Sequence, residues 1–208
     1  LWRKRVAKLV AANDPKTVLD LATGSGDLAA EVQTACPNAT VFGADYCAPM
    51  MRHAREKRGL KPLLVADAMQ LPFDAHSFDA ITVAYGLRNM ASWERALKEM
   101  RRVLSPGGLL VILDFSLPTA PILRGPYRLY LHKVLPSIGG FLTRNHDAYA
   151  YLGDSIERFP SGSNMTALIE RCGFDSADSI PLLGGISSIY TGLATADRPA
   201  PAEPAAAR

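Results

Sequence analysis

The chain has 208 residues, of which 48% are hydrophobic and 21% charged, as in an ordinary globular protein with a single domain. Its 23 basic residues nearly balance its 20 acidic residues, and a net charge of +3 is too small to indicate a nucleic-acid partner. The three cysteines are widely spaced and odd in number, which argues against a disulfide framework and for a reducing, cytoplasmic compartment.

Strands and helices alternate along the first half of the chain. Apolar residues at positions 2, 6, 9 and 10 predict an amphipathic helix at the basic start. Short apolar runs predict buried strands at residues 17–21, 40–44, 63–66, 80–84 and 109–113. Helices are predicted at residues 28–36 and 50–58, and along a face formed by Trp93, Leu97, Met100 and Leu104. This alternation is typical of a doubly wound α/β fold with a mostly parallel sheet.

The pattern changes in the second half. A helix at residues 164–172, with Gly173 as its C-cap, precedes two strands at residues 176–181 and 186–193. We expect these strands to form an antiparallel hairpin that completes a seven-stranded sheet. Residues 115–160 are expected to be a helical insertion, in which Pro126 and Pro136 break two short helices. The domain is therefore predicted to span residues 1–194, followed by a Pro/Ala-rich, disordered tail at residues 195–208.

The first predicted strand ends in a glycine-rich turn that suits two cofactors. Gly24, Ser25 and Gly26 begin a match to G-x-G-x-x-G/A, and Asp45 lies where a dinucleotide-binding motif has its acid. Asp20 within the strand equally suits a loop that binds S-adenosylmethionine. The helix after the turn offers free N–H groups to a pyrophosphate or to a methionine carboxylate. Asp45 at the end of the second strand can accept hydrogen bonds from the ribose of either cofactor.

Two further observations favour S-adenosylmethionine. Asp67 ends the third strand in LLVADAMQLPF, where a polar group can meet an adenine amino group. A dinucleotide needs a second binding half, yet no second glycine-rich turn follows the fourth strand. DLATGSGD, FGAD, VADAMQLPF with SFDAI, and RRVLSPGGLLVI stand in the order and spacing of the class I S-adenosylmethionine-dependent methyltransferases, which the chain resembles. The resemblance implies this cofactor and adds Tyr46, Ala68 and Ala84 to its expected site.

Other segments carry a narrower resemblance. AYGLRNM, LDFSLP, LHKVLPSIGG and AYAYLGDSIERFP are similar to the quinone C-methyltransferases of menaquinone and ubiquinone biosynthesis, over residues 1 to about 194. That family methylates a ring carbon of a prenylated hydroquinone, so the implied substrate is demethylmenaquinol or the ubiquinol precursor. The family also has a segment before the residues that match 1–3, which helps to cover the site. Because the chain begins at Leu1 without a Met, we expect this segment to have been lost.

The implied chemistry needs an ionised acceptor. A ring carbon becomes a good nucleophile when a hydroquinone hydroxyl, which titrates near 10, loses its proton, and a fixed cation favours that loss. Arg88 is assigned to stabilising this phenolate and Asn89 to orienting an oxygen; the alternative is that Arg88 is a salt-bridged loop residue. Arginine is a poor proton acceptor, so the base is either water or the Asp147, Tyr149 and Tyr151 cluster. The four histidines show no ligand spacing, and no metal is expected.

The insertion also predicts where enzyme and lipid meet. No apolar run approaches the ~18 residues of a membrane span, so a prenylated quinol must be met at the bilayer surface. Residues 121–146 combine apolar side chains with Arg124, Arg128 and Lys133, without an acid, and we expect peripheral contact with anionic lipids at the inner face of the membrane. The alternative is that these residues pack on the sheet edge. Two other functions stay open: methylation of another O- or N-acceptor, and donor binding without turnover.

Overall fold

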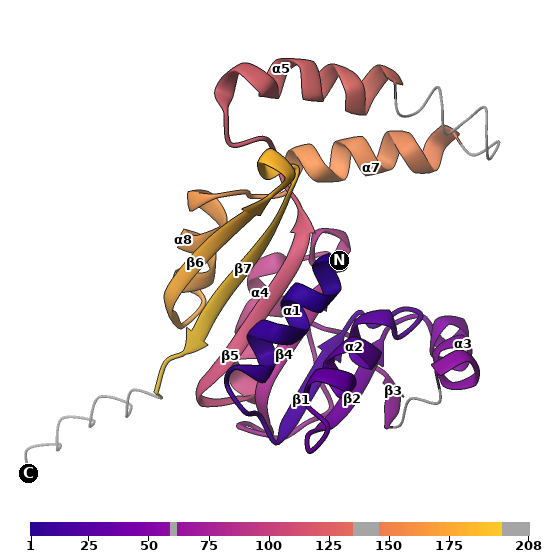
Figure 1. The fold of residues 1–208 in the computed structure, drawn as a ribbon, viewed down its shortest axis with the longest axis vertical. Helices are drawn as coiled ribbons and strands as arrows, with labels where there is room; N and C mark the ends of the chain where they lie inside the picture. The colour runs from indigo at the N-terminus through magenta and orange to yellow at the C-terminus, as the bar shows by residue number, and fades with distance from the viewer. Residues whose placement is uncertain (59–61, 135–145, 197–208) are drawn as a thin grey trace, which may run out of the picture.

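A seven-stranded sheet forms the centre of the molecule, with helices on both faces (Figure 1). The computed structural model describes residues 1–58, 62–134 and 146–196. The strands are β1 (Thr17–Leu21), β2 (Thr40–Asp45), β3 (Leu63–Val65), β4 (Phe78–Ala84), β5 (Leu104–Phe115), β6 (Phe174–Leu182) and β7 (Ser187–Ala194). The α-helices are α1 (Trp2–Ala11), α2 (Asp27–Ala35), α3 (Ala48–Arg58), α4 (Trp93–Val103), α5 (Pro121–Leu129), α7 (His146–Arg158) and α8 (Ser163–Arg171). Short helical turns are η1 (Leu87–Asn89), η2 (Tyr130–Val134) and η3 (Leu183–Gly185).

The strand order is β3-β2-β1-β4-β5-β7-β6. Strands β1 to β5 pair in parallel, whereas β7 pairs antiparallel with both β5 and β6. The predicted doubly wound fold with a C-terminal antiparallel hairpin is thus confirmed. Chain order reverses between β1 and β4, and in open α/β sheets ligands bind outside the carboxyl ends of the strands at such a point.

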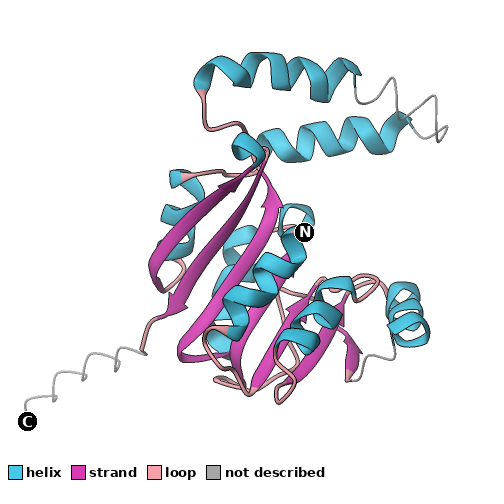
Figure 2. Cartoon of the chain, viewed as in Figure 1, coloured by secondary structure: helices cyan, strands magenta, loops and turns pink. Residues whose placement is uncertain are grey.

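The alternating direction of the side chains along β1 explains how this strand contributes to both hydrophobic clusters. Val18 packs with the residues under α1 and α2, whereas Leu19 and Leu21 belong to the cluster under α4 and α8. Successive side chains of a strand point to opposite faces, so a strand with apolar residues at successive positions is covered on both. Figure 2 shows the resulting layers of helix, sheet and helix. Asp20, between these apolar residues, is thereby carried to the α2 face and buried.

The fifth strand begins earlier than its apolar run predicts. Leu104 belongs to β5, where it pairs with Phe78, and the next pair joins Leu109 to Ala80. The extra residues between these two pairs form an irregularity that contains Gly107, whose φ is +76°. The assignment of Leu104 to the core face of the preceding helix was therefore wrong in its element, although the side chain is buried.

Helices α5 and α7 lie beyond the end of the sheet at which β5 finishes (Figure 1). The predicted break at Pro126 was wrong, because α5 runs through this residue. Proline removes one N–H and leaves one carbonyl of the preceding turn without a partner. No residue of α5 is buried, so water can satisfy that carbonyl. Pro136 and residues 197–208 of the predicted tail lie outside the described residues.

Within the three described ranges, no helix combines the length and the apolar character that crossing a membrane requires.

Candidate active site

Two cavities meet at the carboxyl edge of β1, β2 and β4. The Asp45 cavity, of about 510 Å³, is lined among others by Asp45, Tyr46, Asp67, Ala68 and Asn89. The glycine-loop cavity, of about 190 Å³, is lined among others by Asp20, Gly24, Ser25 and Ala84. Ala22 and Tyr85 line both cavities. The structure therefore brings all the predicted cofactor residues except Gly26 to two compartments with a common wall.

Asp45 ends β2 with its carboxylate fixed by the backbone. Oδ2 accepts from the N–H of Gly24 at 2.8 Å, and Oδ1 accepts from the N–H of Cys47 at 2.8 Å. Each carboxylate oxygen has a second acceptor site, so both remain able to receive a hydroxyl from a ligand. Asp45 therefore ties the glycine loop to β2 while it faces the cavity.

The far wall of the Asp45 cavity follows β3. Asp67 Oδ1 accepts from the N–H of Met69 at 2.9 Å, which fixes the carboxylate beside Ala68. Tyr46 is 80% exposed and stands at the rim, where its ring can cover a ligand. An acid, a small residue and an aromatic rim suit a flat polar group with apolar faces.

The glycine loop needs its glycines for backbone conformation. Gly24 has φ +55° and Gly26 has φ +76°, a region that glycine adopts without steric penalty. Ala22 has φ +54°, although it carries a Cβ, and such local strain is concentrated at ligand sites. Ser25 Oγ donates to Asp27 Oδ2 at 3.1 Å. Gly26 precedes the first residue of α2 and is not among the residues that line the cavity.

Asp20 holds the loop from beneath. Its Oδ2 accepts from Thr23 Oγ1 at 2.5 Å and its Oδ1 accepts from Thr82 Oγ1 at 2.7 Å. Burial raises the pKa of Asp20 to about 6, although these hydroxyls and the backbone N–H of Ala29 act in the opposite direction. The carboxylate thus joins the loop, β4 and the first turn of α2.

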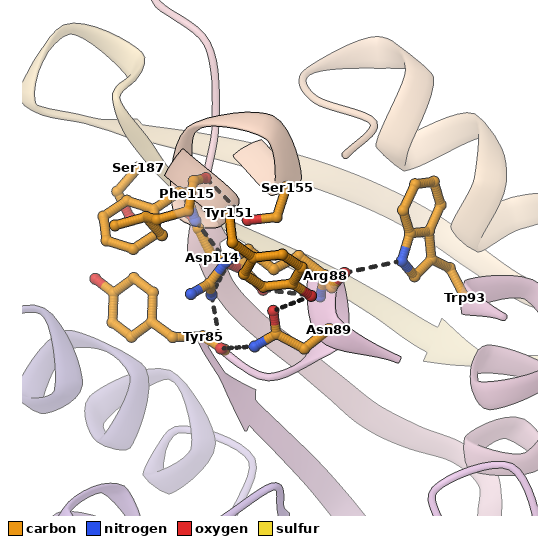
Figure 3. A network of polar contacts seen from close by, with 10 residues as sticks. Tyr85, Arg88, Asn89, Trp93, Asp114, Phe115, Tyr151, Ser155 and Ser187 are labelled. Carbon is orange, nitrogen blue, oxygen red and sulfur yellow. Dashed lines mark hydrogen bonds and ion pairs between the residues drawn. The ribbon is translucent and has the colours of Figure 1, made fainter. Parts of the chain in front are cut away.

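Arg88 is paired with a buried acid. Its Nη1 lies 2.8 Å from Asp114 Oδ1 and donates to the carbonyl of Tyr85 at 2.6 Å. The guanidinium lies 5.1 Å from the centre of the Phe115 ring, and the side chain is only 10% exposed (Figure 3). Nε is the one buried side-chain nitrogen or oxygen in the described ranges that has no partner. Burial raises the pKa of Asp114, whereas the Arg88 charge lowers it.

Asn89 lies closer to open space than Arg88. It lines the Asp45 cavity and also a third cavity, of about 600 Å³, which we call the Trp93 cavity and which Arg88, Trp93, Tyr151 and Ser155 also line. Tyr151 Oη donates to Asn89 Oδ1 at 3.5 Å, a long contact (Figure 3). This places Tyr151 of the predicted base cluster beside the site. The side chains of Asp147 and Tyr149, in the first turns of α7, lie outside the described part of the structure.

The sequence reasoning did not single out Tyr85. This residue has φ +58°, its ring contacts Phe115 with centroids 4.8 Å apart, and its carbonyl accepts from both Arg88 and Asn89. It lies in the segment AYGLRNM, which carried the family resemblance, but neither composition nor spacing reports a positive φ. Among the described residues there is no group of three His, Cys, Asp or Glu side chains that could hold a metal ion.

Comparisons with known proteins agree with this geometry. A model of the ubiE/COQ5 methyltransferase family matches residues 1–194. The chain is 44% identical to a demethylmenaquinone methyltransferase of Thermus thermophilus, over 95% of this chain and 90% of that protein. It is 39% identical to a ubiquinone/menaquinone biosynthesis C-methyltransferase of Geobacter, over 92% and 84%.

Solved structures share the fold. An S-adenosylmethionine-dependent methyltransferase from Aquifex aeolicus has a TM-score of 0.61 and 19% identity, covering 86% of this chain and 81% of that chain. Human N-acetylserotonin methyltransferase in complex with S-adenosylmethionine has a TM-score of 0.65 and 16% identity, covering 93% and 52%. The match to the family model over residues 1–194 and the identity to these relatives show that the chain belongs to the ubiE/COQ5 methyltransferase family and is an S-adenosylmethionine-dependent methyltransferase.

Proposed function

We propose that this enzyme transfers the methyl group of S-adenosylmethionine to a ring carbon of a prenylated hydroquinone, either demethylmenaquinol or the ubiquinol precursor. The functions for which the Thermus thermophilus and Geobacter relatives are named support this acceptor. The observation that carries the proposal is the junction of the two cavities at Ala22 and Tyr85. Tyr85 comes just before the helical turn that contains Arg88 and Asn89.

The donor fits the two compartments by its chemistry. We place the nucleoside in the Asp45 cavity, with the ribose hydroxyls on Asp45, the adenine beside Asp67 and Ala68, and Tyr46 over it. The methionine end then lies in the glycine-loop cavity, against Gly24, Ser25 and Ala84, with Asp20 and Gly26 shaping the loop. The sulfonium would then lie near Ala22 and Tyr85, which line both cavities, and its methyl group could face the acceptor.

The reaction needs alignment and one ionisation. After a hydroquinone hydroxyl loses its proton, the ring carbon attacks the methyl carbon in line, and the carbon–sulfur bond breaks to leave S-adenosylhomocysteine. The attacked carbon then loses its hydrogen as a proton, which restores the aromatic ring. The protein therefore has to hold donor and acceptor in line and to favour the phenolate.

Arg88 and Asn89 both act on the oxygen of the acceptor that becomes the phenolate. The guanidinium of Arg88 is nine-tenths buried, so we propose that it favours the phenolate through its charge. Its pairing with Asp114 fixes this charge and also reduces it, because the pair is close to neutral. Asn89 lines the cavity and orients the acceptor oxygen. Water, or the cluster of Asp147, Tyr149 and Tyr151, accepts the proton.

The oxidation state of the acceptor tests this mechanism. A short-chain demethylmenaquinol should support formation of S-adenosylhomocysteine, whereas the oxidised quinone should not, because it has no hydroxyl to ionise. The assay compares initial rates under anaerobic conditions, with and without a reductant. Equal rates with quinol and quinone would exclude the phenolate mechanism. Activity on a phenol or amine without activity on the quinol would favour another acceptor class.

We also propose that α5 and η2 contact the membrane. Exposed apolar residues line this segment: Ile122, Leu123, Leu129, Tyr130 and Val134. The bases have partners within the protein, since Arg124 Nε donates to the carbonyl of Pro118 and Arg128 pairs with Glu157 at 2.6 Å. Apolar contact therefore contributes more to lipid binding than the sequence-based emphasis on charge implies, and substituting these two arginines would also disturb the attachment of α5.

The test therefore changes apolar residues. Ile122→Asp with Leu129→Asp should strongly reduce sedimentation with anionic vesicles and spare turnover of a short-chain quinol. The control is Asn13→Asp with Asn38→Asp, which adds the same charge at exposed positions before β1 and β2, near the opposite edge of the sheet. Equal vesicle binding by both double variants would contradict the membrane proposal.

A further inference from the structure

The glycine-loop cavity is lined by acidic side chains, although the α-carboxylate at the methionine end of the donor needs a cation. Asp20 and Asp27 both line it, which suits the positively charged ammonium and sulfonium groups. The donor also has an α-carboxylate, which we expected to reach the N–H groups that begin α2. The structure shows that Asp20 already interacts with the N–H of Ala29 in this turn, and Asp27 adds a negative charge there. The carboxylate therefore requires a cation from another element.

Arg3 is the only basic side chain among the described residues that line this cavity. It lies in the first turn of α1. The N-terminal end of this helix points toward the carboxyl end of β5 (Figure 1). Burial raises the pKa of the Tyr85 phenol, and the charge of Arg3 opposes this rise, which places the guanidinium near the junction of the cavities. Within the described ranges the side chain of Arg3 makes no hydrogen bond or ion pair, so its N–H donors are available.

We propose that Arg3 binds the α-carboxylate of the methionine moiety of S-adenosylmethionine, an inference that rests on the proposed function. The planar guanidinium offers paired N–H donors that match a carboxylate. Because Arg3 comes from α1, whereas the other residues of this cavity lie in or follow strands of the sheet or belong to α2 and α3, binding of the donor ties the first helix to the glycine loop. Arg3 thus selects donors that carry an amino-acid carboxylate.

The test compares two ligands that differ only in this carboxylate. Calorimetric titration measures the affinity of wild type, Arg3→Gln and Arg5→Gln for S-adenosylmethionine and for its decarboxylated form. Arg5 is a matched control, because it is an exposed arginine on the same helix and does not line the cavity. Arg3→Gln should weaken binding of S-adenosylmethionine about 10- to 100-fold and leave the decarboxylated ligand unchanged. Arg5→Gln should bind both as wild type does, and Arg3→Lys should recover part of the loss.

Several outcomes would overturn the inference. Equal weakening for both ligands would make Arg3 a structural residue, and unchanged affinity for S-adenosylmethionine would remove it from the site. In both cases wild-type binding and turnover would leave the proposed function intact. Failure of wild type to bind S-adenosylmethionine would instead contradict the function itself. Circular dichroism of each variant separates loss of fold from loss of contact.

Discussion

Replacing Asp20 by asparagine should change how the stability of the unliganded protein depends on pH. The carboxyl group is buried, and its pKa in the folded protein is about 6 against an ordinary value of 3.8. That difference corresponds to about 3 kcal/mol in favour of the protonated form. The asparagine would preserve the shape of the side chain, and the hydroxyls of Thr23 and Thr82 can rotate to donate or accept.

The sign follows from proton binding. Between the two pKa values the folded state holds a proton that the unfolded state has released, so stability falls as pH rises. The contribution of Asp20 is full below about pH 4 and lost above about pH 6, and about 2 kcal/mol of the change falls between pH 4.5 and 7. Relative to Asp20→Asn, the wild type should therefore lose about 2 kcal/mol over this range.

Urea unfolding at several pH values between 4.5 and 7 measures this difference. Subtracting the free energies of unfolding of wild type and variant cancels the other carboxyl groups. Asp175→Asn removes an exposed carboxylate from β6 and should follow the wild type. If wild type and Asp20→Asn gave parallel curves across the range, the buried carboxyl would not titrate as its surroundings require, and the reasoning would be refuted.

Other substitutions test the rest of the site. Asp45→Ala should weaken binding of S-adenosylhomocysteine at least about 100-fold, because charge-assisted hydrogen bonds of about 1.5–3 kcal/mol each are lost; calorimetry checks this, and tight NADH binding instead would contradict the cofactor site. Arg88→Gln should lower turnover far more than donor affinity, with partial recovery at high pH, and should destabilise the fold by about 3–5 kcal/mol because Asp114 stays buried without its partner. Adding Asp114→Asn should restore stability but not turnover, and restored turnover would make Arg88 purely structural. Gly86→Ala would bring a Cβ within 2.4 Å of the Ala22 Cβ, so donor binding should fall, and normal affinity would show that the loop can yield.

The sequence was sufficient to predict the part of the site that lies at the ends of the strands. Strand β1 was predicted to its very residues, because an apolar run ends at a glycine turn. Asp45 and Asp67 were each predicted to end a strand and to contact the cofactor, and both line one cavity. The cofactor followed from this arrangement and from the family motifs.

Other features depend on long-range packing. Arg88 and Asp114 are 26 residues apart, and only the β4–β5 register brings them together, so the ion pair stood merely as an alternative to a free cation. The positive φ of Tyr85 is a property of the folded turn. Pro126 was expected to break a helix, but an exposed helix tolerates it because water can replace the lost bond.

The position of a transferred methyl group tests the central claim most directly. Isotope-labelled S-adenosylmethionine would be incubated with a short-chain demethylmenaquinol under reducing conditions, and NMR would locate the label in the product. We predict that the label is found on a ring carbon, with one S-adenosylhomocysteine formed for each methyl group transferred. A label on a quinol oxygen, or no transfer by a protein that binds S-adenosylhomocysteine tightly, would contradict the account.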